Sequence, residues 1–145
     1  MAKIFVSSVI NVPIKKIWEK TRDFNALPSW HPEVEESHIE NNEPSDKIGC
    51  IRNFTLKDGS RIREKLLALN DIENLCTYSI LESQMKVENY AATMRFLPIT
   101  DGNQTYAEWT AEFNCPPSDE AGLVKLISGA VFQGGFDALK EFFGV

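Results

Sequence analysis

Arg52 and Glu64 are the residues of this sequence whose types and spacing best suggest chemistry. They flank the turn sequence Lys57-Asp58-Gly59, which suits a three-residue hairpin loop with Gly59 in the left-handed conformation. Such a loop pairs Leu56 with Ser60 and makes Arg52 and Glu64 direct cross-strand partners, with Cβ atoms about 4.5–5.5 Å apart. The sequence therefore predicts an arginine and a carboxylate side by side on one face of a sheet.

The neighbours of this pair divide cleanly between the two faces of the hairpin. The face of the pair also carries the apolar residues Cys50, Phe54, Leu56, Ile62 and Leu66. The opposite face carries Asn53, Thr55, Arg61, Arg63 and Lys65. A two-residue loop over Asp58-Gly59 would mix the two sets, because a slip of one residue inverts a strand, and we reject it.

An ion pair among apolar neighbours needs an explanation beyond stability, since desolvation costs several kcal/mol per ion. One interpretation is a polar handle in a cavity, which holds a ligand or moves a proton. The other is a satisfied buried pair that sets the register of the strands. The residue pattern leaves both interpretations open.

Aromatic and small residues elsewhere complete the candidate cavity. Tyr78 and Tyr90 would each bring a hydroxyl to an apolar interior, where such groups need a partner. Ala130, Gly134 and Ala138 form a stripe of small residues, which permits close packing or leaves a hollow, and the polar pair favours the hollow. The predicted ligand-binding residues are Trp30, Phe54, Tyr78, Met94, Trp109, Ala130 and Gly134, and the predicted catalytic residues are Arg52, Glu64 and Tyr90.

The segment Phe24–Pro32 has two interpretations of its own. It is interrupted by Pro28 and Pro32, which limits it to a short helix and a loop. It forms either one wall or gate of the cavity, or a rigid loop whose Trp30 caps the core.

Strands between helices must position these residues. Alternating and β-branched apolar residues predict strands over Lys3–Val12, Val34–Glu40, Ile48–Leu56, Arg61–Leu69, Leu75–Leu81, Val87–Pro98 and Gln104–Cys115. Helices are predicted from Pro13 to about Asp23, briefly within Phe24–Pro32, and from Asp119 to about Phe143. This segregation indicates an α+β fold, in which a seven-stranded antiparallel sheet curves around a long C-terminal helix, with two short helices after the first strand.

Composition restricts the classes of function. The 145 residues, 43% hydrophobic and 25% charged, suit one domain over 1–145. The formal charge of −6 without a basic cluster argues against nucleic acid, and no apolar run is long enough for a membrane span or a signal peptide. Cys50, Cys76, Cys115, His31 and His38 form no metal-binding motif, so we expect no metal, no cofactor and a reducing, cytoplasmic location. Nothing in the sequence indicates an oligomeric state.

Motifs along nearly the whole chain resemble the polyketide cyclase/dehydrase-like branch of the START and birch-pollen-allergen helix-grip superfamily. The resemblance rests on Val12-Pro13 before Ile17-Trp18, Asp23-Phe24 through Trp30-His31-Pro32, Ile48-Gly49-Cys50-Ile51-Arg52, Arg63-Glu64-Lys65-Leu66, Thr77-Tyr78-Ser79-Ile80, Asn89-Tyr90-Ala91-Ala92 and Glu108-Trp109. In this order the motifs are typical of the helix-grip fold.

Within that superfamily the sequence is similar to plant lachrymatory-factor synthases. The resemblance implies that Arg52 and Glu64 match an arginine and a glutamate implicated in rearranging a small sulfenic acid, and that Tyr90 matches a nearby tyrosine. The sequence is also similar to plant abscisic-acid receptors, which bind a hormone and catalyse nothing. The short hairpin at Lys57-Asp58-Gly59 departs from both groups, so the fold leaves the function open.

Two hypotheses therefore stand together. The first is a carrier or ligand-binding protein that holds a small hydrophobic molecule, with the Arg52–Glu64 pair as its polar anchor. The second is a cofactor-independent cyclase, dehydratase or isomerase. In it, Glu64 acts as acid/base with its carboxylate form favoured by Arg52, Arg52 stabilises charge on a ligand oxygen, and Tyr90 and Tyr78 orient that oxygen.

Overall fold

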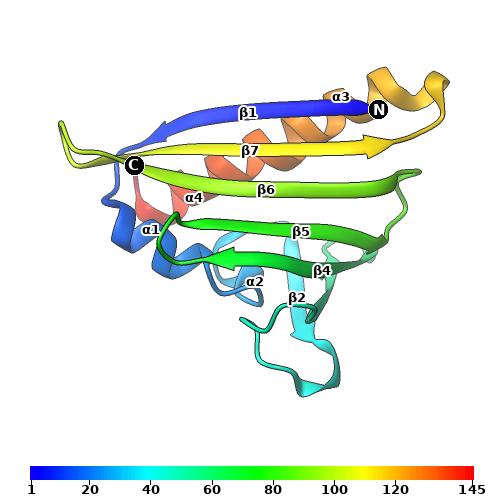
Figure 1. Cartoon of the computed structure of the whole chain (residues 1–145), viewed down its shortest axis with the longest axis horizontal. Helices are drawn as coiled ribbons and strands as arrows, with labels where there is room; N and C mark the ends of the chain where they lie inside the picture. Colours follow the sequence, from blue (N-terminus) through cyan, green and yellow to red (C-terminus); the bar gives the residue numbers. More distant parts are fainter.

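The computed structural model describes residues 1–145, and its framework is one antiparallel sheet with the strand order β1-β7-β6-β5-β4-β3-β2 (Figure 1). The strands are β1 (Ala2–Ile10), β2 (Val34–Ile39), β3 (Ile51–Leu56), β4 (Arg61–Asn70), β5 (Leu75–Glu82), β6 (Glu88–Ile99) and β7 (Gln104–Asn114). All seven predicted strands are present, with ends that differ by at most three residues. From β2 to β7 each strand pairs with the next in sequence, and β1 then closes against β7.

The helices gather on one face of this sheet (Figure 1). Helices α1 (Ile14–Thr21) and α2 (Leu27–Trp30) follow β1, and short 3-10 turns lie at Glu40–Asn42 and Pro117–Asp119. The last helix consists of α3 (Glu120–Leu126), a π-helical segment (Ile127–Gln133) and α4 (Gly134–Phe143) in direct succession. The predicted α+β helix-grip fold is confirmed, and the predicted long last helix contains this π segment. No helix combines the length and apolar character needed to cross a bilayer.

The β3–β4 hairpin has the register that the turn residues predict. The Leu56 amide donates to the Ser60 carbonyl over 2.9 Å, and Gly59 has φ +88°. Arg52 is consequently paired with Glu64, and Phe54 with Ile62. Because this register puts Cys50, Arg52, Phe54, Glu64 and Leu66 on the helix side of the sheet, all of these side chains are buried.

Alternation of side chains on β6 and β7 builds the rest of the core. The buried residues on these two strands are Tyr90, Ala92, Met94, Phe96, Thr105, Ala107, Trp109, Ala111 and Phe113. They meet α1, α2 and the last helix through large side chains such as Ile17, Phe132 and Phe136. The period of two predicted from the sequence is therefore present along both strands.

The last helix approaches the sheet closely at Gly135. A Cβ at Gly135 would lie 2.7 Å from Trp109 Cζ3, whereas a Cβ at the neighbouring Gly134 would meet only the Gly129 carbonyl, at 3.6 Å. The indole of Trp109 stacks on Phe132, with ring centroids 4.6 Å apart. Of the predicted small-residue stripe, Ala138 packs in the core. The stripe thus provides close packing as well as space, and Gly135 is the glycine that the sequence interpretation missed.

Candidate functional site

A cavity of about 390 Å³ lies between the curved sheet and the last helix. Hydrophobic residues make up 14 of the 22 that line it. The inner lining includes Arg52, Phe54, Glu64, Tyr78, Tyr90 and Trp109. Ile127, Ala130 and Val131 contribute the wall on the π-helical segment. The sequence hypothesis of a hollow beside the polar pair is therefore matched by a cavity at that place.

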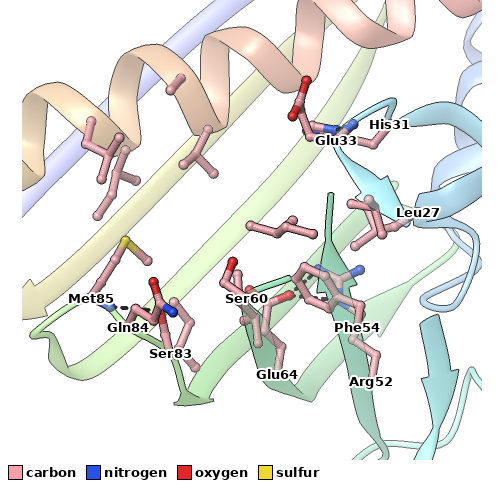
Figure 2. Close-up of a pocket in the computed structure, with 18 of the residues that line it drawn as sticks. Leu27, His31, Glu33, Arg52, Phe54, Ser60, Glu64, Ser83, Gln84 and Met85 are labelled. Atoms are coloured by element: carbon pink, nitrogen blue, oxygen red, sulfur yellow. Dashed lines mark hydrogen bonds and ion pairs between the residues drawn. The ribbon is translucent and has the colours of Figure 1, made fainter. Parts of the chain in front are cut away.

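The polar part of the cavity is the Arg52–Glu64 pair (Figure 2). Arg52 Nε donates to Glu64 Oε1 over 2.8 Å, and Arg52 Nη2 lies 2.6 Å from the same oxygen. Only 8% of Arg52 and 6% of Glu64 is exposed. Both guanidinium contacts therefore go to one carboxylate oxygen inside the protein.

Aromatic rings hold the Arg52 guanidinium in place. Its Cζ atom lies 4.0 Å from the ring centroid of Phe24, 5.0 Å from that of Tyr78 and 5.6 Å from that of Phe54. Arg52 Nη1 also donates to the Phe24 carbonyl over 3.1 Å. Cation–π contacts of this kind are worth more when the cation is desolvated. Arg52 is thus tied both to its carboxylate and to the segment that precedes α2.

The second oxygen of Glu64, Oε2, is available to a guest. It accepts none of the hydrogen bonds of the structure, since the one from Arg52 Nε goes to Oε1. Among side-chain polar atoms sealed from solvent, only Arg95 Nε lacks a partner, so Oε2 is not sealed and borders open space. Because Glu64 lines the cavity, that space is the cavity itself.

Burial decides the protonation behaviour of Glu64. Desolvation raises the pKa of its carboxyl above the ordinary value, and the charge and hydrogen bonds of Arg52 oppose this rise without cancelling it. Arg52 favours the carboxylate form, as the sequence predicts, but burial has the larger effect on the pKa. The physical cause of the net rise is the loss of water around the carboxyl, which a single neighbouring arginine does not replace.

Two tyrosines and a tryptophan form the wall next to Glu64. Trp109 Nε1 donates to the Tyr78 hydroxyl over 3.1 Å. The ring of Tyr90 stacks on Phe113, with centroids 5.8 Å apart. Burial raises the pKa values of both tyrosines, with the nearby Glu64 charge adding to the rise. Both hydroxyls therefore keep their protons at neutral pH and remain hydrogen-bond donors.

Other polar residues also line the cavity. They are His31, Glu33, Asp58, Ser60, Ser83 and Gln84, and Figure 2 labels all of them except Asp58. The Glu33 amide donates to His31 Nδ1 over 3.3 Å, which leaves the other ring nitrogen as the donor in neutral His31. Burial lowers the pKa of His31, with Arg52 adding to that effect and Glu33 opposing it. His31 is thus favoured in its neutral form.

Most of the predicted site residues come together around this cavity. Those that line it are Arg52, Phe54, Glu64, Tyr78, Tyr90, Trp109 and Ala130. Trp30, Met94 and Gly134 do not line it. Trp30 and Met94 are packed in the core, and a Cβ at Gly134 would meet only the Gly129 carbonyl of the same helix. For Trp30, this favours the interpretation of a residue that caps the core, while Leu27 and His31 of the same segment do form part of the cavity wall.

The sequence interpretation missed several residues that line the cavity. Ser83, Gln84 and Met85 lie in the loop between β5 and β6. In a sheet of consecutive antiparallel strands, the β3–β4 and β5–β6 turns lie at the same end, so topology is the signal that points to these residues. The side chains themselves carry no motif.

The cysteines lie outside the cavity wall. Cys50, Cys76 and Cys115 are all free, and burial raises the pKa of the Cys76 thiol to about 11. No group of three or more histidine, cysteine or acidic side chains is placed to hold a metal ion.

Comparison with known proteins places this geometry in context. The sequence profile of a family described as "Polyketide cyclase / dehydrase and lipid transport" matches residues 1–143. Among solved structures, an uncharacterized protein of Bacillus thuringiensis is similar, with a TM-score of 0.88 and 28% identity over 99% of this chain and 100% of its own.

Two further structures resemble this chain to a similar degree. The protein XoxI of Bacillus cereus has a TM-score of 0.87 and 29% identity, covering 99% of this chain and 96% of its own. A protein of Thermobifida fusca has a TM-score of 0.88 and 26% identity, covering 99% of this chain and 94% of its own. The fold and its extent are therefore shared along the whole chain.

Proposed function

The chain belongs to the polyketide cyclase/dehydrase and lipid transport family, and from that premise we propose that it binds a small hydrophobic organic molecule in its internal cavity, as a carrier or ligand-binding protein. The observation that carries this proposal is the cavity of about 390 Å³ with a mostly hydrophobic lining. Its size falls within the range of about 300–1,000 Å³ that small-molecule sites occupy.

The Arg52–Glu64 pair gives this cavity a polar anchor. A guest would place its apolar body against Phe54, Trp109 and Val131 and one polar group beside Glu64 Oε2. A buried pair with a free carboxylate oxygen costs desolvation free energy, which a hydrogen bond from a guest would partly recover. Affinity would then come mainly from apolar area and selectivity from this anchor.

The direct test is native mass spectrometry of the purified protein, before and after organic extraction. We expect an apolar compound in near-stoichiometric amount, or else saturable binding of isopropylnaphthalene by the extracted protein. Ala130→Phe, which would fill part of the cavity, should weaken binding about tenfold or more. Ala121→Phe is the matched control, because Ala121 is also exposed on the last helix but does not line the cavity. Equal binding by both variants would contradict the proposal.

A second candidate is a cofactor-independent cyclase, dehydratase or isomerase. It is favoured by one specific observation, the raised pKa of Glu64 together with its free oxygen Oε2, because a general base works best with a pKa near the operating pH. Glu64 would accept a proton from carbon next to a carbonyl. Tyr90 and the remaining N–H groups of Arg52 would stabilise the enolate oxygen, and reprotonation at another atom would complete an isomerisation.

Deuterium exchange at the methyl group of methyl naphthyl ketone, followed by NMR, tests this candidate. Glu64→Gln should abolish protein-dependent exchange while leaving the affinity for the ketone within about threefold. Glu40→Gln, on the outer face of the sheet, is the control. Exchange that survives in Glu64→Gln would eliminate the proposed base and leave the binding function alone.

A further inference from the structure

The indole of Trp109, which forms part of the cavity wall, is held at both of its ends. At the pyrrole end, Nε1 donates to the Tyr78 hydroxyl over 3.1 Å. Tyr78 lies on β5, and its partner on the intervening strand β6 is Ala92, whose small side chain leaves the indole room to reach across. At the benzene end, Cζ3 faces Gly135 on α4, where a Cβ would lie only 2.7 Å away. The position of the indole therefore depends on one hydrogen bond to the sheet and on the absence of a side chain from the helix.

Two phenylalanines of the last helix pack against the same indole. Phe132 stacks on it with ring centroids 4.6 Å apart and planes 8° from parallel, and Phe136 meets it at 5.6 Å in a tilted arrangement. Both phenylalanines are fully buried, so neither has solvent into which it could move. Interiors packed in this way resist extra volume, which forces side chains or backbone to shift. The open space that borders Trp109 is the cavity that it lines.

A methyl group at Gly135 would consequently change the shape of the cavity. To bring Cζ3 from 2.7 Å to an ordinary carbon–carbon contact, the indole has to move by about 1 Å. Because Phe132 and Phe136 occupy the helix side, this movement carries the ring toward the cavity. At the adjacent Gly134, a Cβ would meet only a carbonyl oxygen at 3.6 Å, which is an ordinary contact. Of these two neighbouring glycines, only Gly135 restricts where Trp109 lies.

We propose that Gly135 is a specificity-determining position: by leaving room for the Trp109 indole against the helix, it sets how far this ring projects into the cavity and thereby the largest guest that the cavity admits. This inference rests on the proposed binding function and adds the size class of the guest. At about 390 Å³ the cavity lies near the lower end of the range of about 300–1,000 Å³ for small-molecule sites, so the guest is a compact molecule. Trp109 contacts the guest, and Gly135 is a positioning residue that acts through it.

Three hydrocarbons of increasing size test the size limit: naphthalene, isopropylnaphthalene and diisopropylnaphthalene, with binding to the extracted protein measured by calorimetry. In the unaltered protein, affinity should rise from the first to the second, and the third should bind about tenfold more weakly than the second or worse. Gly135→Ala should weaken the binding of isopropylnaphthalene about fivefold or more and that of naphthalene less than about twofold. The larger guest alone needs the space that the displaced indole takes.

Gly134→Ala is the matched control for Gly135→Ala. Both replace a helical glycine by alanine and gain the same helix propensity, but only the methyl group at Gly135 meets Trp109. Gly134→Ala should therefore retain the affinities of the unaltered protein for all three hydrocarbons.

A smaller ring in place of the indole separates an effect on the cavity from an effect on the helix. Trp109→Phe should raise the affinity for diisopropylnaphthalene about fivefold or more, because it enlarges the cavity. When Gly135→Ala is combined with Trp109→Phe, the added methyl group no longer meets an indole. The double variant should then bind all three hydrocarbons as Trp109→Phe does, and this comparison holds even where Gly135→Ala alone fails to fold.

The outcomes distinguish this inference from the binding function on which it rests. Equal affinity of the unaltered protein for the two substituted naphthalenes would overturn the size limit. A loss of affinity that is the same in Gly134→Ala as in Gly135→Ala, or that persists in the Trp109→Phe background, would overturn the role of Gly135, because the helix and not the indole would then have moved. In each of these cases the binding function stands. Absence of binding of all three hydrocarbons would instead contradict the binding function, and the inference with it.

Discussion

Two arginine–glutamate pairs lie on opposite faces of the same hairpin, and their carboxyls behave in opposite ways. On the inner face, Arg52 contacts Glu64 at 2.6 and 2.8 Å. On the outer face, Arg63 donates from Nε and Nη2 to the two oxygens of Glu40 at 2.7 and 2.9 Å. The distances are nearly equal. Yet Arg63 and a hydrogen bond from Asn53 lower the pKa of Glu40 to about 2, whereas burial raises the pKa of Glu64.

The difference shows that contact distance alone does not determine how an ion pair shifts the pKa of its carboxyl. The side chains of the outer pair are 30% and 21% exposed, so water still solvates both charges. The side chains of the inner pair are 10% and 8% exposed, so each charge depends on the other and on a few hydrogen bonds. The outer pair fastens the Glu40–Asn42 turn to the sheet, and the inner pair carries the cost of removing two charges from water.

The largest expected effect comes from removing one arginine from each pair. Arg52→Ala should lower the free energy of unfolding by about 3–5 kcal/mol, because it leaves Glu64 buried and unpaired. Arg63→Ala should cost only about 0–1 kcal/mol, because Glu40 returns to water. Urea denaturation of both variants measures the difference. Similar losses would mean that the inner pair is solvated in solution.

Removing both inner charges should recover much of that loss. In Arg52→Met with Glu64→Leu, the methionine can pack against Phe24 and no charge remains to be desolvated. We expect stability within about 1–2 kcal/mol of the unaltered protein, since apolar replacement of a buried pair is often neutral or favourable. The same urea titrations provide the measurement. A double variant as unstable as Arg52→Ala would show that the pair itself stabilises the fold.

The pH dependence of stability should differ in sign between the two carboxyls. Glu40 has a lowered pKa, so its contribution is present above its ordinary value of 4.5 and is lost as the pH falls toward about 2. Glu40→Gln should reduce the fall in melting temperature that accompanies this acidification. Glu64 has a raised pKa, so its contribution is present below 4.5 and is lost as the pH rises through the folded-state value.

In the unaltered protein, the contribution of Glu64 to stability should therefore decrease as the pH rises above 4.5. In Glu64→Gln this decrease should be absent when stability at each pH is compared with the stability of the same variant at low pH. The melting temperature measured across the acid range checks both variants. If Glu40→Gln and Glu64→Gln changed the pH dependence of the melting temperature in the same direction, this would contradict the contrast between the two faces.

Ionic strength should give the smallest effect. Raising salt shortens the Debye length from about 10 Å at 0.1 M to about 3 Å at 1 M, which screens exposed charges far more than buried ones. The stability difference between the unaltered protein and Arg63→Ala should therefore shrink with salt, while that for Arg52→Ala should stay constant. Urea titrations at the two ionic strengths measure this. A salt-sensitive Arg52→Ala difference would indicate water around the inner pair.

Much of the fold and part of the site could be predicted because they depend on local chemistry. The turn at Lys57-Asp58-Gly59 determines the register that pairs Arg52 with Glu64, and alternation along β7 assigns Trp109 to the inner face. The π-helical segment and the close approach at Gly135 could not be predicted. They depend on how one helix meets side chains from strands far away in sequence.

The sequence by itself determined which residues share a face, because turn geometry and the alternation of strands are properties of short stretches of chain. It thereby placed Arg52 beside Glu64 with no knowledge of the rest of the molecule. The tertiary structure alone decided that a cavity remains next to them, that burial outweighs Arg52 in raising the pKa of Glu64, and that Trp109 reaches Tyr78 across Ala92. Desolvation and free volume are sums over many distant neighbours, so only the assembled fold determines them.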